Sequence, residues 1–293
     1  MNRFAIGPVV IGSTVLWQTL NVRVNPGIQR LVQSAQRVDT AFAGAIKQLP
    51  LLSFDTHAIA KGVGAIGFAG ENAATVDVYF RALEHGGTFQ AGSKHVKVTL
   101  YDTLGILRRI RANQWAEAVA SFDVLGVFDG SQEPIAIATD QALPAYTASD
   151  IEKFTVGPGS LDAVPLDNIQ SFELDTGIRE VADGQDGGLY ARFAAIHERQ
   201  PIIRVTTFDS SSLHTIDEGG SSQDDATLFL RGLTNKGEPI DDATAGHISI
   251  VAKESHVTVS DMGETTTIEV QPVYDGTNDL LSITAAQAIS SGA

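Results

Sequence analysis

The stretch Phe4-Ala5-Ile6-Gly7-Pro8 has a counterpart 150 residues further along the chain, Phe154-Thr155-Val156-Gly157-Pro158. Collinear matches follow it; they place Gly27-Ile28 with Gly177-Ile178, Pro50-Leu51-Leu52 with Pro201-Ile202-Ile203, Phe80-Arg81-Ala82-Leu83 with Leu230-Arg231-Gly232-Leu233, His95-Val96-Lys97-Val98 with His247-Ile248-Ser249-Ile250, and Val127-Phe128-Asp129-Gly130 with Val273-Tyr274-Asp275-Gly276. The shared residues are glycines, prolines, aromatic residues and alternating aliphatic residues, which set turns and cores. The chain therefore predicts one fold written twice in tandem.

The repeat divides the 293 residues into two units, 1–148 and 149–293, with the boundary near Ala145–Asp150. A chain of this length can bury hydrophobic cores without disulfides or metals. Hydrophobic residues make up 43% of it and charged residues 19%, which is a globular composition. No apolar run reaches the roughly 20 residues that span a bilayer, so we expect no membrane partner.

Strand signals dominate each unit. His95 to Leu100 alternates polar and apolar residues with a period of two, and Asp77 to Phe80 is rich in β-branched and aromatic residues. Val124–Phe128 and Pro134–Ala138 flank Asp129-Gly130, a pair that suits a hairpin turn with positive φ. We therefore expect about seven or eight strands in each unit, arranged as a β-sandwich or barrel.

The segment Leu104–Ser121 is ambiguous alone, because it contains good helix formers. Its counterpart in the second half contains Val257-Thr258-Val259 and Thr265–Val270, which favour strands. Since homologous units share a fold, we predict two strands here, over Ile106–Ala112 and Ala116–Phe128.

One short helix is expected in each unit. Asp55-Thr56 forms an N-cap signal before His57–Lys61, and Gly62 is expected to end that helix. In the second unit the corresponding helix would cover Ser211–Ile216 and end at Gly219-Gly220. The expected fold class is mainly β, with two tandem β-sandwich or barrel units that each carry one short α-helix.

The motifs of common enzymes are missing from the sequence. There is no cysteine, which excludes disulfides and thiol catalysis, and the seven histidines show no metal-binding spacing. Gly62–Gly67 matches the glycine pattern of dinucleotide-binding loops, but it follows a helix signal instead of a strand. We therefore expect no enzyme activity, no catalytic residues, no metal and no cofactor.

The charge is distributed unevenly. Residues 1–150 contain 12 basic and 12 acidic residues, whereas residues 151–293 contain 8 and 23, so the net charge of −15 arises in the second half. An acidic surface disfavours gripping of nucleic acid. The excess either serves solubility or forms a surface that DNA passes without adhering.

Two groups of residues are candidates for assembly contacts. Arg81 and Arg231 share one repeat position, where an arginine suits an ion pair between subunits or a charge that protects an edge strand. The loops Gly64–Ala74 and Leu213–Asp225 are long and glycine-rich and suit contacts between rings. Their candidate residues are Gly64, Gly70, Glu71, Asp217, Glu218, Asp224 and Asp225.

Two segments resemble a known family. Pro50–Gly64 and the region Val124–Leu143 around Asp129-Gly130 are similar to parts of the tail tube proteins, or major tail proteins, of long-tailed bacteriophages. The resemblance implies a subunit of stacked six-fold rings whose inner sheets join into one barrel. A chain with two such units would close the ring as a homotrimer with pseudo-six-fold symmetry.

The resemblance also implies partners and a location. We expect a tail protein of the virion, assembled in the host cytoplasm, that contacts tape measure, terminator and baseplate proteins and lets DNA pass as non-adhering cargo. One alternative is a baseplate or distal tail ring protein of the same fold. Another is a tandem receptor- or carbohydrate-binding module, although Trp17 and Trp115 have no tryptophan counterparts in the second half. A hydrolase would need an acid/base pair that the sequence does not reveal.

Overall fold

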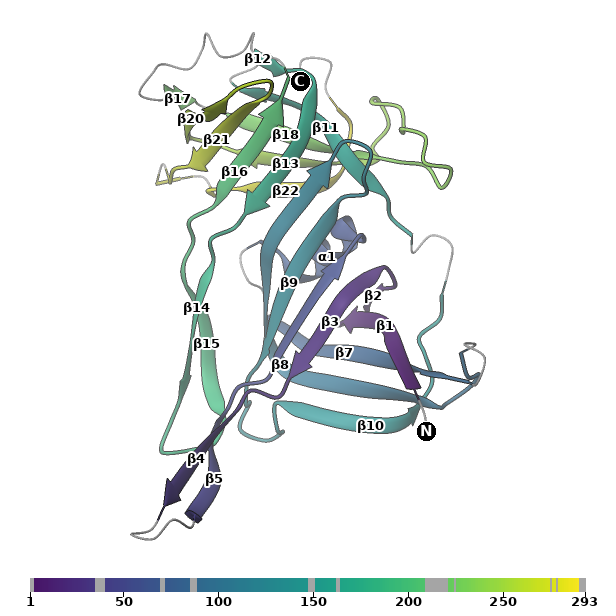
Figure 1. Ribbon diagram of the computed structural model, residues 1–293, viewed down its shortest axis with the longest axis vertical. Coiled ribbons are helices and arrows are strands. Elements are labelled where there is room, and N and C mark those ends of the chain that lie inside the picture. The colour runs from purple at the N-terminus through teal and green to yellow at the C-terminus, as the bar shows by residue number, and fades with distance from the viewer. Residues whose placement is uncertain are drawn as a thin grey trace.

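The computed structural model describes residues 3–34, 40–68, 72–84, 89–146, 151–161, 164–208, 221–223, 225–274, 276–277 and 279–289. Within these residues the protein is mainly β, as the sequence predicted, and it has one helix of eight residues (Figure 1). Elements of the first half are β1 (Arg3–Ile11), β2 (Thr14–Leu16), β3 (Thr19–Asn25), β4 (Ile28–Ser34), β5 (Thr40–Gln48), β6 (Leu51–Thr56), α1 (Ile59–Ile66), β7 (Asn72–Leu83), β8 (His95–Asn113), β9 (Val119–Gly126) and β10 (Ile135–Gln141). Elements of the second half are β11 (Phe154–Leu161), β12 (Val164–Leu166), β13 (Ile169–Asp175), β14 (Arg179–Gly184), β15 (Ala191–Glu198), β16 (Ile202–Thr207), β17 (Ser221–Gln223), β18 (Ala226–Gly232), β19 (His247–Ala252), β20 (Ser255–Met262), β21 (Thr266–Pro272) and β22 (Ser282–Gln287).

The long strand β8 organises the first half. Its N-terminal part pairs with β7 and β10, and its C-terminal part pairs with β9. The resulting series are β10-β8-β7-β1-β2 and β8-β9-β6-β3. Apolar side chains of both series and of α1 form a common core, in which the rings of Phe54 and Phe122 stack at 5.4 Å.

Strand pairing in the second half follows the same scheme. Its series are β22-β19-β18-β11-β12 and β20-β21-β16-β13. Even the register corresponds, since Ile6 pairs with Phe80 as Val156 pairs with Leu230, and an irregularity follows both pairs. The two halves therefore correspond in strand pairing, with β7 matched by β17 and β18, and β8 matched by β19 and β20; each half has more strands than the seven or eight expected.

The two halves share one sheet. β13 pairs with the C-terminal part of β8, which joins the strands in the order β3-β6-β9-β8-β13-β16-β21-β20-β17. We call this series the continuous sheet. In Figure 1 its strands lie side by side and cross the view diagonally, from β20 at the upper left to β3 at the lower right.

The connection between the halves holds α1 in place. The Glu152 carboxylate accepts hydrogen bonds from the backbone N–H groups of Ala60 and Lys61, at the start of α1. The Gln18 side chain binds both the N–H and the C=O of Glu152. Burial raises the pKa of Glu152, more than its two hydrogen bonds lower it.

Several local expectations need correction. The helix does not end at Gly62 but continues to Ile66. Gly62 allows close packing of the helix against the Phe122 ring, which a Cβ at this position would meet at 2.9 Å. The Gly62–Gly67 pattern consequently lies mostly within α1. The helix expected over Ser211–Ile216 lies outside the described residues.

The strands around Asp129-Gly130 do not form the predicted hairpin. β9 pairs with β6 and β8, whereas β10 pairs with the N-terminal part of β8. In the second half β21 and β22 likewise pair with different strands. The connection 127–134 thus joins β9 to β10, which both pair with the long strand β8. Gly130 in this connection has the positive φ that was expected. The predicted strands within Leu104–Ser121 are confirmed as parts of β8 and β9.

Candidate functional site

The junction between β8 and β13 is held by backbone pairing and by charge. Asp175 pairs with Arg109, and Glu173 pairs with Arg111, in antiparallel register. Arg109 lies 3.3 Å from Glu173 and 3.4 Å from Asp175, and Arg111 lies 3.7 Å from Glu173. Arginines of the first half therefore face carboxylates of the second half on one side of the continuous sheet.

The hairpin β14–β15 forms an arm that reaches from the second half along the first half (Figure 1). Arg108 fastens it, through a bond of 2.7 Å to Glu180 and one of 2.6 Å to the carbonyl of Ile178, and it also binds Asp123 at 2.7 Å. Burial acts to lower the pKa of Arg108, but the hydrogen bonds to Glu180 and Asp123 outweigh it and raise the pKa. The guanidinium therefore stays charged in this contact.

Backbone and apolar contacts continue along the arm. The N–H of Gln48 donates to Leu189, and the N–H of Phe128 donates to the carbonyl of Ala191 at 2.8 Å. At its base, Ile178 is buried in a cluster with first-half residues. The remaining buried members of that cluster are Leu104, Ile106 and Leu125.

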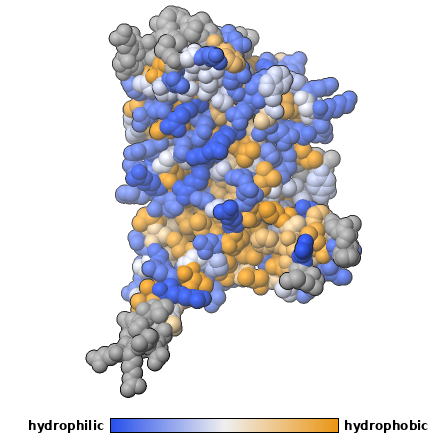
Figure 2. Space-filling model, viewed as in Figure 1, coloured by the Kyte–Doolittle hydropathy of each residue, from blue (hydrophilic) through white to orange (hydrophobic). Residues whose placement is uncertain are grey.

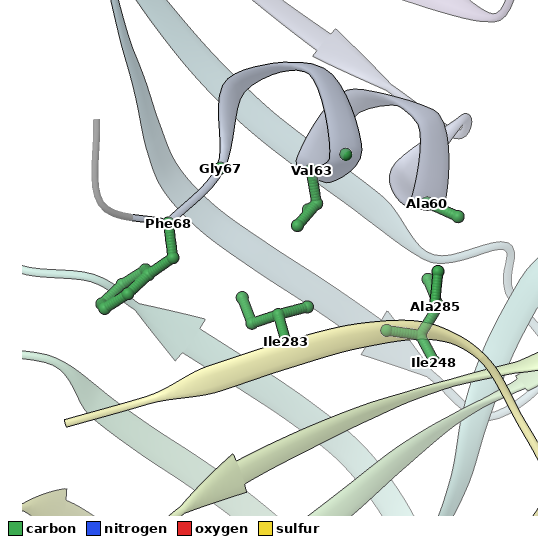
Figure 3. Close-up of a pocket in the computed structure, with 8 residues that line it drawn as sticks. Ala60, Val63, Gly67, Phe68, Ile248, Ile283 and Ala285 are labelled. Carbon is green, nitrogen blue, oxygen red and sulfur yellow. The ribbon is translucent and has the colours of Figure 1, made fainter. Parts of the chain in front are cut away.

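The helix of the first half also contacts the second half. Figure 3 shows Val63 directed toward Ile283 of β22 across a small pocket, with Phe68 to one side. The pocket is lined by Ala60, Val63, Gly64, Gly67, Phe68, Ile248, Ile283 and Ala285. These residues carry no titratable group, so the contact is apolar packing between the halves.

The continuous sheet has one apolar and one polar face. Along β6, β9, β16 and β21, buried residues alternate with polar ones such as Ser53, Asp123 and Glu269. Ser53 donates to Asp123, and Arg204 pairs with Glu269 at 3.0 Å. On this face Arg109, Arg111 and Arg204 each have a carboxylate partner, whereas Arg23, which pairs in register with Ser53, has no ion-pair partner within the described residues.

Equivalent positions of the two halves differ sharply in exposure. Phe4 is 46% exposed and Phe154 7%, while Ile28 is 47% exposed and Ile178 4%. The order is reversed near the end of each unit, where Val127 is 5% exposed and Val273 52%. In Figure 2 hydrophobic residues gather over the lower half of the face in view, in the region of β1, β3 and β7. Surfaces that are covered at the internal junction are thus open at the two ends of the molecule.

Arg81 and Arg231 have partners within the chain. Arg81 donates to the carbonyl of Ile6 at 3.0 Å and lies over the ring of Phe89, and burial lowers its pKa. Arg231 pairs with Asp242 at 2.9 Å. Both arginines lie on strands with a neighbour on each side, β7 and β18, so the edge-strand interpretation is wrong.

The structure describes two of the loop candidates, Gly64 and Asp225. Gly64 lies within α1 instead of a loop, and Asp225 pairs with Lys253 at 2.9 Å. Gly70, Glu71, Asp217, Glu218 and Asp224 lie outside the described residues. Sequence reasoning missed the charged residues of the β8–β13 junction. Their signal was present, since Arg109 and Arg111 alternate on one predicted strand, and Glu173 and Asp175 alternate on a segment near the start of the second unit.

In the part of the chain that the structure describes, no three His, Asp or Glu side chains gather where they could hold a metal ion. No helix among these residues has the length and apolar character to cross a membrane. No protein-family model matches the chain, and no curated protein matches it in sequence. The fold and the junction define a mainly β protein whose two halves have corresponding strand pairing and are joined through one sheet.

Proposed function

We propose that this chain is a structural subunit of a bacteriophage tail tube, which closes into homotrimeric rings with pseudo-six-fold symmetry around a channel for DNA. The β8–β13 junction is the observation that carries the proposal. It joins two equivalent units head to tail, through different strands of each unit. A head-to-tail contact that is repeated generates a ring when its rotation closes.

The proposal treats the two halves as copies of one ancestral unit. Its support is the equivalent strand pairing, with partners at a nearly constant offset of about 150 residues. Three chains then supply six units to a ring.

The polar face of the continuous sheet suits the wall of the channel. DNA binds proteins mainly through contacts of its phosphates with lysine and arginine. On this face Arg109, Arg111 and Arg204 are each paired with a carboxylate, and the whole chain has a net charge of −15. Such a wall lets DNA pass without adhering.

The remaining elements of the proposal rest on the resemblance to tail tube proteins. They are stacking of the rings into a tube, contacts with tape measure, terminator and baseplate proteins, and a place in the tail of the virion. A distal tail or baseplate ring of the same fold would form rings that do not stack.

Mass measurement by light scattering, with negative-stain images of the same fractions, tests the proposal. We expect particles of three chains of 31.0 kDa each, or stacks of them, with a central hole. A chain that stays monomeric at every concentration contradicts it.

A carbohydrate-binding module is the second candidate, because Trp115 is 93% exposed. In that case the monomer would bind glycans and lose the binding on substitution Trp115→Ala.

A further inference from the structure

We infer that the seam between neighbouring subunits joins the free edge of β20 in one copy to the free edge of β3 in the next, in the register of the β8–β13 junction. The inference rests on the proposed ring and identifies the strands and residues that close it. Its basis is that β3 is equivalent to β13, and β20 is equivalent to β8, in strand pairing.

The register of the seam follows from the internal junction. β3 is related to β13 by 150 residues. β20 is related to β8 by 152 residues, because the irregularity between Leu107 and Arg109 matches the one between Val259 and Asp261. The internal pair Asp175–Arg109 thereby becomes Asn25 of one copy and Asp261 of its neighbour.

Over the described part of the chain, both strands have a stretch of edge without a strand partner. Within the described residues, β3 pairs only with β6. Among the described residues β17 covers β20 from Ser255 to Val257, and none of them pairs with Thr258–Met262 on that side. In the register of the internal junction, Asn25 and Val24 face Asp261 and Met262 at the end of β20, so the seam pairs fewer residues of β20 than the internal junction, in which β13 pairs with β8 from Ser171 to Asp175.

The charges at the seam are complementary and reversed in sign relative to the internal junction. Arg109 and Glu173, 3.3 Å apart, correspond to Asp261 and Arg23. Arg23 and Asp261 are exposed, and neither has an ion-pair partner within the described residues. A two-fold pairing of β3 with a second β3 centred on Arg23 would oppose two arginines, and one of β20 with a second β20 centred on Asp261 would oppose two aspartates. The charges therefore favour a head-to-tail seam over a two-fold dimer.

Apolar surfaces flank the same seam. Phe4 and Ile28 are exposed on the β3 side, and their equivalents Phe154 and Ile178 are buried at the internal junction. On the β20 side Val273 is exposed where its equivalent Val127 is buried. The hairpin β4–β5 projects beyond the body of the molecule, whereas β14–β15 lies along the first half (Figure 1). Docking of the next copy would cover these surfaces.

Cysteine cross-linking tests the seam directly, because the chain has no cysteine of its own. Residues paired across antiparallel strands have Cα atoms roughly 4.5–5.5 Å apart, which suits a disulfide. Asn25→Cys combined with Asp261→Cys should give covalent dimers and a closed covalent trimer after oxidation, reversed by reductant. The matched control is Asp175→Cys with Arg109→Cys, which should form a disulfide within one chain and leave its mass unchanged. The two pairs are matched in a further respect. Asp175→Cys removes the hydrogen bond that the N–H of Gly177 donates to the Asp175 side chain, and Asn25→Cys removes the corresponding bond from the N–H of Gly27.

The outcomes separate the seam from the ring. Trimeric rings that form without any cross-link between positions 25 and 261, while the control pair oxidises, would overturn the seam and leave the proposed function standing. A chain that neither cross-links nor assembles at high concentration contradicts both.

Discussion

Ile28 and Ile178 occupy one repeat position, and their substitution by alanine should affect different equilibria. Ile28 is 47% exposed in the single chain and Ile178 is 4% exposed. If the seam covers Ile28 as the junction covers Ile178, each seam buries about four-tenths of one more isoleucine. Full burial of such a side chain stabilises by about 1.5–3 kcal/mol, so the gain is about 1 kcal/mol per seam.

A closed trimer contains three seams, so Ile28→Ala should weaken ring formation by about 3 kcal/mol, or about a hundredfold in the association constant. The midpoint concentration of a monomer–trimer equilibrium varies with the inverse square root of that constant. It should therefore rise about tenfold, while the melting temperature of the monomer changes little.

Light scattering over a dilution series gives the midpoint, and thermal unfolding gives the stability of the monomer. The control Ile178→Ala should show the opposite pattern, a loss of about 2–5 kcal/mol in folding stability, because it leaves a cavity in a buried cluster. An unchanged midpoint for Ile28→Ala, in a chain that forms rings, would refute the reasoning.

Three further predictions follow from the charges. Arg23→Glu or Asp261→Arg alone should weaken ring formation by about 1 kcal/mol per seam, and the double variant should restore it, as read from the same dilution series. His95 is buried and accepts a hydrogen bond from the N–H of Ala82; burial, together with the charge of Arg81, lowers its pKa. Its neutral form therefore stabilises the fold fully above about pH 6.5 and loses that contribution as the pH falls toward the folded pKa, so His95→Gln should flatten the acid side of a melting-temperature profile. Burial raises the pKa of Glu152, so the folded state favours its protonated form. The stability that this preference contributes is present at low pH and is lost as the pH rises through the folded pKa. Glu152→Gln should thus keep the melting temperature at neutral pH, whereas Glu152→Ala removes the cap of α1 and should cost about 1 kcal/mol.

The repeat made much of the fold predictable. A register in which Val156 pairs with Leu230 follows from Ile6 and Phe80 once the offset of 150 residues is known. Comparison of the halves also assigned Leu104–Ser121 to strands against its helical propensity, because packing within a sheet overrides local preference.

Other features depended on partners far away in the sequence. The Asp129-Gly130 turn was recognised from its residues, but the strands on each side of it pair with different parts of β8. Gly62 was read as a helix stop, although its contact with Phe122, far along the chain, explains the glycine. Local patterns identify strands and turns, whereas the choice of partner depends on the whole sheet.

The charges at the proposed seam are reversed relative to those at the internal junction, and this reversal would also act against incorrect assembly. A chain with two identical units could pair β20 of one copy with β13 of another, or β8 with β3, since the strands are equivalent. In the same register the first of these pairings would place Asp261 opposite Asp175, and the second would place Arg23 opposite Arg111, so both bring like charges together. Only β8 with β13, and β20 with β3, match opposite charges. Specificity of this kind comes from repulsion in the wrong pairs as much as from attraction in the right ones, and in the proposed ring it would fix the strict alternation of first and second units.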